Sequence, residues 1–162
     1  MVLEIEMLGS TMAAAVTGVD LSSPVDDETA LQLRQAVTDH LVVCIRNQHL
    51  SPRQLASAGR FFGLLKTFVL RNDRIEEAPE VSVVSNRPPM LDGKSLVQTK
   101  HWHTDDSYLA EPATLTLLHA VNLPQSGGDT EFINCYAVLD ALPPDLRQRI
   151  EGLRAVHKYL SR

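Results

Sequence analysis

Residues 124–128, Pro-Gln-Ser-Gly-Gly, form a turn sequence that separates two segments with the character of β-strands. The first segment, 113–121, is a long strand candidate, and the chain returns as a second candidate at 130–133. Upstream, the apolar run Leu-Val-Val-Cys-Ile at 41–45 is rich in β-branched residues, as buried strands are. Strands with scattered helices predict an α+β fold, mainly β, in which a sandwich or roll carries flanking helices. A repeated βαβ unit is not expected.

Two helices are expected in the N-terminal half of the chain. Ser23 or Asp26 would cap the first helix, whose apolar residues at helical spacing are Leu31, Leu33, Ala36 and Val37. Ser51 caps the second, and Pro52 occupies its first helical position. Gly63 is expected to end the second helix.

Shorter elements are expected elsewhere. The predicted strands are 3–8 and 81–84, the predicted loops are 71–80 and 86–94, and the predicted helices are 136–142 and 143–153.

Length and composition fit one domain over residues 1–162. Hydrophobic residues make up 44% of the chain and charged residues 22%, so a core can form. The net charge of -5 argues against a nucleic-acid partner. No apolar run approaches the ~20 residues of a membrane span, and Glu4 and Glu6 precede the small apolar residues at 12–16, unlike a secretory signal. We therefore expect a cytoplasmic protein in which Cys44 and Cys135 are free thiols.

His103 and Asp105 form a His-x-Asp pair that suits a metal ion. Residues 97–105 alternate as a strand would, and residues i and i+2 of a strand point to the same face about 6.6 Å apart. An imidazole nitrogen and a carboxylate oxygen can lean together across that gap onto one ion. A third ligand from elsewhere would complete a two-histidine, one-carboxylate face, which leaves three positions of iron(II) open for oxygen chemistry. The pair alone is a weak signal.

Other roles for the neighbouring histidines stay open. His101 and His103 could be a ligand pair as in a cupin. A cupin would have a glutamate a few residues further on, whereas the next glutamate here, Glu111, comes later than that. His101 and Asp105 would lie about 13 Å apart on a straight strand, too far to share one ion. His119, inside an apolar strand candidate, is better interpreted as a structural histidine.

Further motifs surround the pair. Trp-His-Thr-Asp at 102–105 is followed by Asn-Leu-Pro-Gln-Ser-Gly-Gly-Asp-Thr at 122–130. Upstream and downstream motifs are Gly-Val-Asp-Leu-Ser at 18–22, Arg-Asn-Gln at 46–48, Leu-Ser-Pro at 50–52, Phe-Gly at 62–63, Tyr-Ala-Val-Leu-Asp-Ala-Leu-Pro at 136–143 and Gly-Leu-Arg-Ala-Val-His at 152–157. In this order they resemble the taurine dioxygenase and 2,4-dichlorophenoxyacetate dioxygenase family of iron(II)- and 2-oxoglutarate-dependent oxygenases. The resemblance covers nearly the whole chain.

The resemblance implies a double-stranded β-helix (jelly roll) with flanking helices, present here as its N-terminal portion. It implies that His103 and Asp105 are the first two iron(II) ligands and that the Thr130 hydroxyl helps to hold the carboxylate of 2-oxoglutarate. The implied reaction oxidises a small molecule with O2 and yields succinate and CO2. A histidine at the place of His157 is common in the family and is not the third ligand.

The family's third iron ligand, a histidine, and its 2-oxoglutarate arginine lie further downstream than Arg162, where this sequence ends. We therefore expect a fragment, or half of a split enzyme that pairs with a second chain, or a remnant that binds or assembles, for example as a homo-oligomer, without catalysis. Low or absent activity is expected of these 162 residues by themselves.

Small organic acids are frequent substrates in the family. Taurine is not expected here, because the substrate-binding histidine that the taurine branch has after Phe-Gly is absent from 64–71. Tyr108 and Trp102 are candidate pocket residues, although Trp102 is more readily explained by packing. Arg71 is a candidate for contact with an anion. With Lys66 and Arg74, it also fits the simpler interpretation of a solvated surface charge.

Overall fold

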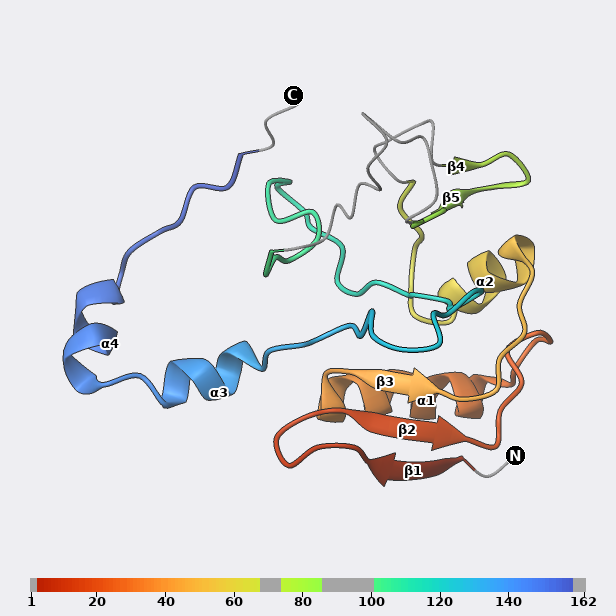
Figure 1. Ribbon diagram of the computed structural model, residues 1–162, viewed down its shortest axis with the longest axis horizontal. Helices are drawn as coiled ribbons and strands as arrows, with labels where there is room; N and C mark the ends of the chain where they lie inside the picture. The colour runs from red at the N-terminus through yellow and green to blue at the C-terminus, as the bar shows by residue number, and fades with distance from the viewer. Residues whose placement is uncertain (1–2, 68–73, 86–100, 159–162) are drawn as a thin grey trace.

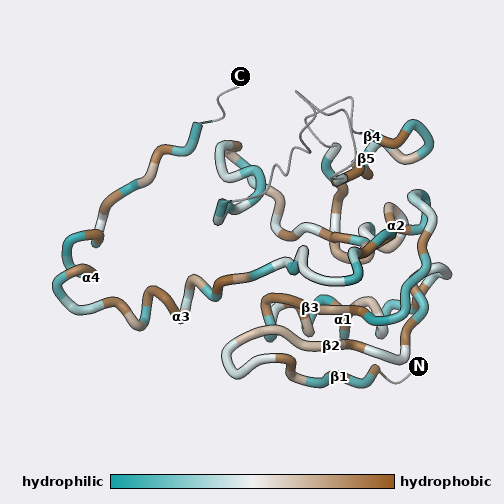
Figure 2. Tube along the Cα trace, viewed as in Figure 1, coloured by the Kyte–Doolittle hydropathy of each residue, from teal (hydrophilic) through white to brown (hydrophobic). Residues whose placement is uncertain are grey.

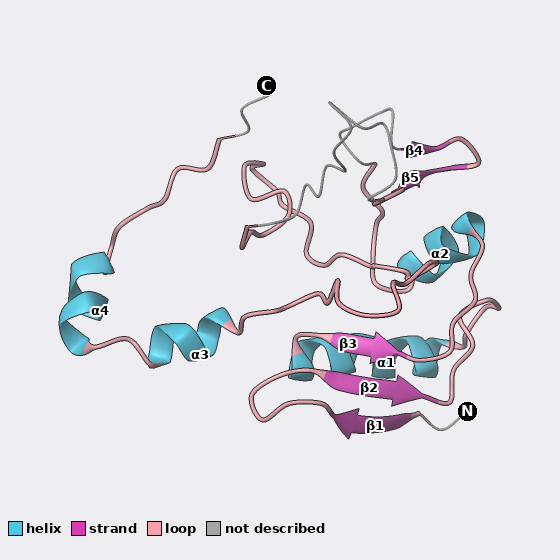
Figure 3. Cartoon of the chain, viewed as in Figure 1, coloured by secondary structure: helices cyan, strands magenta, loops and turns pink. Residues whose placement is uncertain are grey.

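The computed structural model describes residues 3–67, 74–85 and 101–158 (Figure 1). Its elements are, in order, β1 (Glu4–Met7), β2 (Ala14–Thr17), α1 (Asp27–His40), β3 (Val43–Ile45), α2 (Pro52–Gly59), β4 (Arg74–Ile75), β5 (Ala78–Ser82), α3 (Cys135–Asp140) and α4 (Pro144–Ile150). This mixture of helices and small sheets agrees with an α+β fold. A predominance of strands is not seen in the described part, where helical residues outnumber strand residues (Figure 3).

The N-terminal residues form a three-stranded sheet with α1 lying along it (Figure 1). β1 pairs with β2 antiparallel, and Ile5 lies opposite Val16. β2 pairs with β3 in parallel, and Val16 lies opposite Ile45. Parallel neighbours need a crossover connection, which α1 supplies. One βαβ unit is therefore present, and it is not repeated among the described strands.

The hydrophobic core lies between this sheet and the two long helices. Val16 and Leu33 have no exposed surface, and Ala36 and Ala58 bring α1 and α2 into the same cluster. Leu31, expected on the apolar face of α1, is instead 58% exposed. Successive residues are about 100° apart around a helix, so Leu31 and Leu33 point to nearly opposite sides. Positions i and i+3, such as Leu33 and Ala36, do share a face.

Side-chain caps begin both long helices. The carboxylate of Asp26 accepts a 2.7 Å hydrogen bond from the Thr29 amide, so Asp26 rather than Ser23 caps α1. Hydrogen bonds from the side chain and then the backbone of Thr29 lower the pKa of Asp26. At α2, the Gln54 amide donates to Ser51 Oγ at 3.3 Å and the Ser51 amide donates to Gln54 Oε1 at 2.9 Å. This capping box confirms the predicted start of α2.

The end of α2 differs from the prediction, because the helix stops at Gly59 rather than at Gly63. The chain continues through a turn in which each hydrogen bond spans three residues rather than the four of an α-helix. The Phe61 amide donates to Ala58 O at 3.1 Å, and the Phe62 amide donates to Gly59 O at 3.0 Å. Gly63 follows with φ of 145°, a conformation that a side chain disfavours. The glycine therefore marks the exit from the turn, not the last residue of the helix.

Part of the predicted loop at 71–80 is an antiparallel hairpin. β4 pairs with β5, so the strand expected at 81–84 begins earlier, at Ala78. Arg60 forms a 3.3 Å ion pair with Glu80, and Ala78 is only 4% exposed. Charged side chains can stay in solvent while their backbone pairs, so their polarity alone did not reveal the hairpin.

Residues 113–121 alternate between half-buried and exposed positions as a strand does, but they have no partner strand among the described residues. The half-buried positions are Ala113, Leu115, Leu117 and His119, and the positions between them are exposed. This segment, 130–133 and 101–105 form no ladder with any described residue, while 97–100 lie outside the described residues. These strand predictions are not met, because alternation needs only an extended chain, whereas a strand also needs a hydrogen-bonded neighbour.

The described sheets have three strands and two strands, and neither closes into a roll. A jelly roll pairs strands that are distant in the sequence, and the extended segments at 113–121 and 130–133 have no such neighbour here. The jelly roll therefore stays a prediction.

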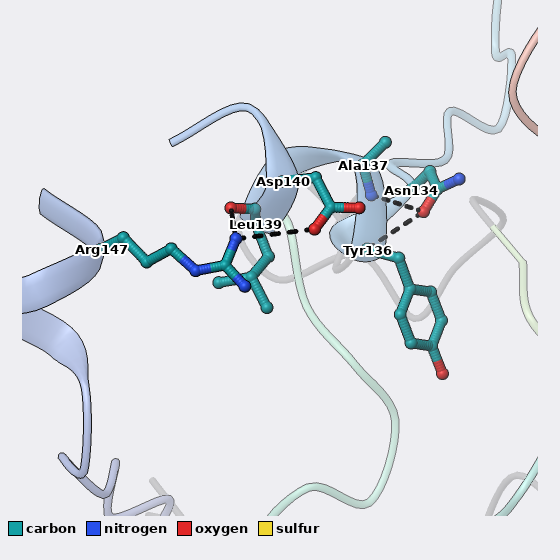
Figure 4. Close-up of polar contacts among 6 residues, drawn as sticks. All are labelled: Asn134, Tyr136, Ala137, Leu139, Asp140 and Arg147. Atoms are coloured by element: carbon teal, nitrogen blue, oxygen red, sulfur yellow. Dashed lines mark hydrogen bonds and ion pairs between the residues drawn. The ribbon is translucent and has the colours of Figure 1, made fainter. Parts of the chain in front are cut away.

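Residues 134–158, which we call the arm, contain α3 and α4 and reach away from the sheet (Figure 1). Asn134 anchors its base. Its Oδ1 accepts from the amides of Tyr136 at 3.0 Å and Ala137 at 3.1 Å, capping α3 (Figure 4). Its Nδ2 donates to the carbonyl of Thr11, in the β1–β2 connection, at 3.0 Å. One side chain thus starts a helix and ties the arm to the sheet.

Arg147 joins the two helices of the arm. Its guanidinium donates to the Leu139 carbonyl at 3.3 Å and lies 3.6 Å from Asp140 Oδ1 (Figure 4). Both helices are shorter than the predicted 136–142 and 143–153. Apolar positions recur along them (Figure 2), and none is buried.

Among the residues that the structure describes, no helix is long and apolar enough to cross a membrane.

Candidate metal centre

His103 and Asp105 lie close together although they are not on a strand. The chain has no regular secondary structure at His103 and enters a turn at Asp105, where Asp106 has φ of 56° and the Leu109 amide donates to Asp106 O at 2.8 Å. Within this geometry His103 Nε2 is 3.3 Å from Asp105 Oδ1. Both side chains are about half exposed, at 54% and 52%. The predicted proximity of the pair therefore survives without the predicted strand.

The His103 ring is oriented by a backbone group. Its Nδ1 lies 2.8 Å from the carbonyl oxygen of His101. A carbonyl can only accept, so this hydrogen bond requires a proton on Nδ1. In the neutral ring, Nε2 then carries the free lone pair, and it is this atom that faces Asp105. Metal-ligating histidines commonly have such a backbone partner on the other ring nitrogen.

The carboxylate of Asp105 has a partner on its other oxygen. Thr116 Oγ1 donates to Asp105 Oδ2 at 2.8 Å. The two oxygens therefore differ, since Oδ2 faces a hydroxyl and Oδ1 faces the imidazole. The sequence showed Thr116 only as one polar residue in a strand candidate, and no motif marked its contact with a residue eleven positions away.

The facing atoms fit a cation. Two ligands at right angles around an ion about 2.1 Å away are roughly 3 Å apart, close to the 3.3 Å between His103 Nε2 and Asp105 Oδ1. A protonated imidazole would instead make an ion pair there. Within the described residues, no group of three or more His, Cys, Asp or Glu could hold a metal. The pair therefore offers two ligands of the expected three.

His157 is not brought to the pair as a third ligand. Its Nδ1 lies 2.7 Å from the hydroxyl of Ser107, which closes the far end of the arm onto the turn after Asp105. His119 Nε2 lies 3.3 Å from the carbonyl of Gln48. This backbone partner agrees with the structural role expected of His119.

Gln48 makes that contact part of a larger connection. Its side chain accepts from the Leu21 amide at 2.8 Å and donates to Val19 O at 2.9 Å. His119 thereby attaches the segment 113–121 to a loop that is itself bonded to the core.

The other candidate residues are spread around the pair. Thr130 follows Gly127 and Gly128, whose φ values of 70° and 77° need glycine, and it is exposed, with no hydrogen bond to the pair among the described residues. Trp102 is 63% exposed, so the described residues do not give it the packing role that the sequence favoured. Tyr108 is half-buried.

The basic candidates are dispersed. Lys66 Nζ donates to the backbone carbonyl of Glu111, the residue that a cupin-like site would have needed as a ligand. Arg74 begins β4, and Arg71 lies outside the described residues.

Comparison with known proteins gives consistent matches. Residues 4–162 match the family model for taurine catabolism dioxygenase TauD, TfdA family. The chain is 34% identical over 160 residues to alpha-ketoglutarate-dependent 2,4-dichlorophenoxyacetate dioxygenase of Cupriavidus pinatubonensis, covering 92% of this chain and 56% of the relative. It is 34% identical over 162 residues to pentalenolactone F synthase of Streptomyces avermitilis, covering 94% and 52%.

Solved structures agree. A taurine dioxygenase from Burkholderia xenovorans has a TM-score of 0.77 and 26% identity, covering 98% of this chain and 54% of that one. AAD-2, crystallised with Mn(II) and N-oxalylglycine, has a TM-score of 0.73 and 26% identity, covering 93% and 54%. The chain spans about half the length of the curated relatives it matches. Because the family match runs over nearly all of its residues, the chain belongs to the TauD, TfdA family of dioxygenases.

Proposed function

We propose that this chain is the N-terminal portion of an iron(II)- and 2-oxoglutarate-dependent dioxygenase that hydroxylates a small organic acid. The observation that carries the proposal is the pair of facing lone-pair atoms, His103 Nε2 and Asp105 Oδ1, 3.3 Å apart within the residues that match the family model. A neutral imidazole and a carboxylate are two of the three ligands of the facial triad that non-haem iron(II) oxygenases use.

In this proposal His103 and Asp105 hold the iron from one side, and Thr130 donates its hydroxyl to a carboxylate of 2-oxoglutarate. Bound iron(II) and 2-oxoglutarate supply the oxygen chemistry, in which O2 oxidises the substrate and converts 2-oxoglutarate into succinate and CO2. The N-oxalylglycine in the AAD-2 structure is an analogue of 2-oxoglutarate, which supports this choice of cosubstrate.

The third iron ligand and the cation for 2-oxoglutarate are proposed to come from polypeptide outside these residues, in a longer chain or a second subunit. The pattern of exposure supports this division. Large hydrophobic side chains stand in solvent throughout the second half of the chain: Leu118, Val121, Leu123, Phe132, Ile133, Tyr136, Leu153 and Val156. In a completed jelly-roll domain, of which residues 1–162 would be the first part, further strands would pair with these segments and cover them.

A metal titration tests the centre. Mn(II) broadens the NMR signals of nearby nuclei, so the ring signals of His103 should broaden at millimolar Mn(II) and those of His40 should not. His103→Ala and Asp105→Ala should each abolish the selective effect on the remaining partner. Equal broadening of all histidines, or an unchanged effect in both variants, would contradict the assignment.

A turnover assay tests the division. With iron(II), ascorbate, 2-oxoglutarate and O2, the 162-residue chain should form succinate only at the background rate. Robust turnover that is lost in His103→Ala would show that no further ligands are required.

The substrate class rests on relatives. Besides the dichlorophenoxyacetate enzyme, the chain is 32% identical to (S)-phenoxypropionate/alpha-ketoglutarate-dioxygenase of Sphingobium herbicidovorans. We propose an organic acid, with Tyr108 and Trp102 on the pocket wall and Arg71 near the substrate anion. In the complete protein, aryloxyalkanoates and taurine can be compared as substrates through succinate yield. Turnover of taurine alone would contradict the expectation that taurine is not the substrate, and turnover of neither acid would count against the proposed substrate class.

A second function is favoured by the same exposed side chains. The chain would then be a binding or assembly module without catalysis, as a homo-oligomer or with a second chain. Size-exclusion chromatography with light scattering distinguishes the cases. A defined dimer supports assembly, whereas non-specific aggregation supports an incomplete domain.

A further inference from the structure

The two oxygens of the Asp105 carboxylate are used differently. Oδ1 faces His103 Nε2 at 3.3 Å, and Oδ2 accepts a hydrogen bond from Thr116 at 2.8 Å. A hydrogen bond to an ionised carboxylate is shorter and stronger than one between neutral groups. The hydroxyl therefore restricts rotation of the carboxylate and occupies the oxygen that does not face the imidazole.

Thr116 is placed by contacts outside the His-Thr-Asp motif. It lies on the exposed face of segment 113–121, where Thr114 and Leu118 are its neighbours on the same face. His119, on the opposite face, contacts the Gln48 carbonyl at 3.3 Å. Because side chains alternate along an extended chain, anchoring His119 toward the core turns Thr116 away from it and toward Asp105.

We propose that Thr116 is a positioning residue for the metal centre, which holds Asp105 so that only Oδ1 is presented to the ion. This inference rests on the proposed function, since it assumes that Asp105 is a metal ligand. The backbone carbonyl of His101 orients His103 in the same way, because it accepts a hydrogen bond from Nδ1 and leaves Nε2 free. Both ligands are thus oriented by a partner on their second polar atom, the arrangement that keeps ligand geometry in metalloproteins.

The expected loss of metal affinity can be judged from other proteins in which a metal ligand has lost its hydrogen-bond partner. Removing a hydrogen-bond partner of a metal ligand commonly weakens metal binding by about 10–100-fold. Thr116→Val keeps the branched shape and removes the donor, whereas Thr116→Ser keeps the donor. Thr114→Val makes the same chemical change on the same exposed face, two residues away from the carboxylate's partner.

The experiment is a Mn(II) titration of the 162-residue chain, in which binding is measured from the broadening of the His103 ring signals. Thr116→Val should raise the apparent Kd by about 10-fold or more. Thr116→Ser should restore binding to within about 3-fold of the wild type, and Thr114→Val should match the wild type. Amide NMR spectra of all variants should be alike apart from the mutated site, because each substitution is at an exposed position.

Three results would overturn the inference. Wild-type affinity in Thr116→Val, with binding still lost in Asp105→Ala, would remove the role of Thr116 and leave the proposed centre intact. Failure of Thr116→Ser to restore binding would show that the methyl group rather than the hydroxyl matters. Wild-type Mn(II) binding in Asp105→Ala would instead overturn the metal centre, and this inference with it.

Discussion

Residues 3–62 and residues 101–158 follow similar local rules and reach different degrees of order. In the first region β1, β2 and β3 pair, and Val16 and Leu33 lose all exposure. In the second region the candidate metal ligands are in place, yet no residue is buried and no strand forms. Helix caps occur in both, at Ser51 and at Asn134. Local sequence therefore starts helices and orients a ligand pair, while burial depends on what packs against them.

The largest expected contrast is in core stability. Leu33→Ala removes a side chain with no exposed surface and should lower the free energy of unfolding by about 2–5 kcal/mol. Leu153→Ala removes one that is 71% exposed and should change it by less than about 0.5 kcal/mol. Urea denaturation measures both values. Equal losses would show that the second region shares the packed core.

The next contrast concerns the helix caps Ser51 and Asn134, whose side-chain oxygens both accept hydrogen bonds from backbone amides. Ser51→Ala should cost about 1 kcal/mol of unfolding free energy, because α2 contributes Ala58 to the core. Asn134→Ala should leave global unfolding nearly unchanged, because α3 has no buried residue. It should instead speed amide hydrogen exchange in α3. A global loss in Asn134→Ala would mean that its bond to Thr11 holds the arm in the folded unit.

The pH dependence of the first region should be small and should have a defined sign. Hydrogen bonds from Thr29 hold the pKa of Asp26 below its ordinary value of 3.8. A carboxyl whose pKa is lower in the folded state binds its proton more readily when unfolded, so it stabilises the fold above that ordinary value. This contribution should disappear as the pH falls from about 4 through the folded pKa.

Asp26→Asn gives the matched comparison, because asparagine can still cap the helix and does not titrate. Thermal unfolding between pH 6 and pH 2.5 should lose stability more steeply in the wild type than in this variant. Asp20, whose pKa is lowered by Ser22, shifts in the same direction and is common to both proteins. Parallel curves would contradict the cap's electrostatic contribution.

The smallest expected effect is the position of one proton in the second region. The bond between His103 Nδ1 and the His101 carbonyl should keep the neutral ring protonated at Nδ1. Nitrogen-15 chemical shifts of the ring, measured in the metal-free chain at a pH where the imidazole is neutral, report the tautomer. A predominance of the Nε2-protonated form would show that the ligand pair is not oriented locally.

The accuracy of the sequence predictions follows the same division. Asp26 and the Ser51-Gln54 box were predictable because a cap acts on amides two or three residues away. The exposure of Leu31 could also have been predicted from the sequence, because helix geometry places Leu31 and Leu33 on nearly opposite sides. The β4–β5 hairpin was missed because backbone pairing leaves charged side chains in solvent. The strand prediction at 113–121 captured the alternation in burial but not the absence of a partner strand among the described residues.

For this protein, the sequence by itself determined the family, the start of α2 and the identity of His103 and Asp105 as the candidate ligand pair. These follow from short-range chemistry and from the order of motifs along the chain. Only the tertiary structure brought Thr116 to Asp105 and His119 to Gln48. Contacts between distant residues depend on how the chain packs, and no local pattern encodes them. The same reason separates a buried β2 from the segment at 113–121, which has strand-like alternation but no partner strand in the described part of the chain.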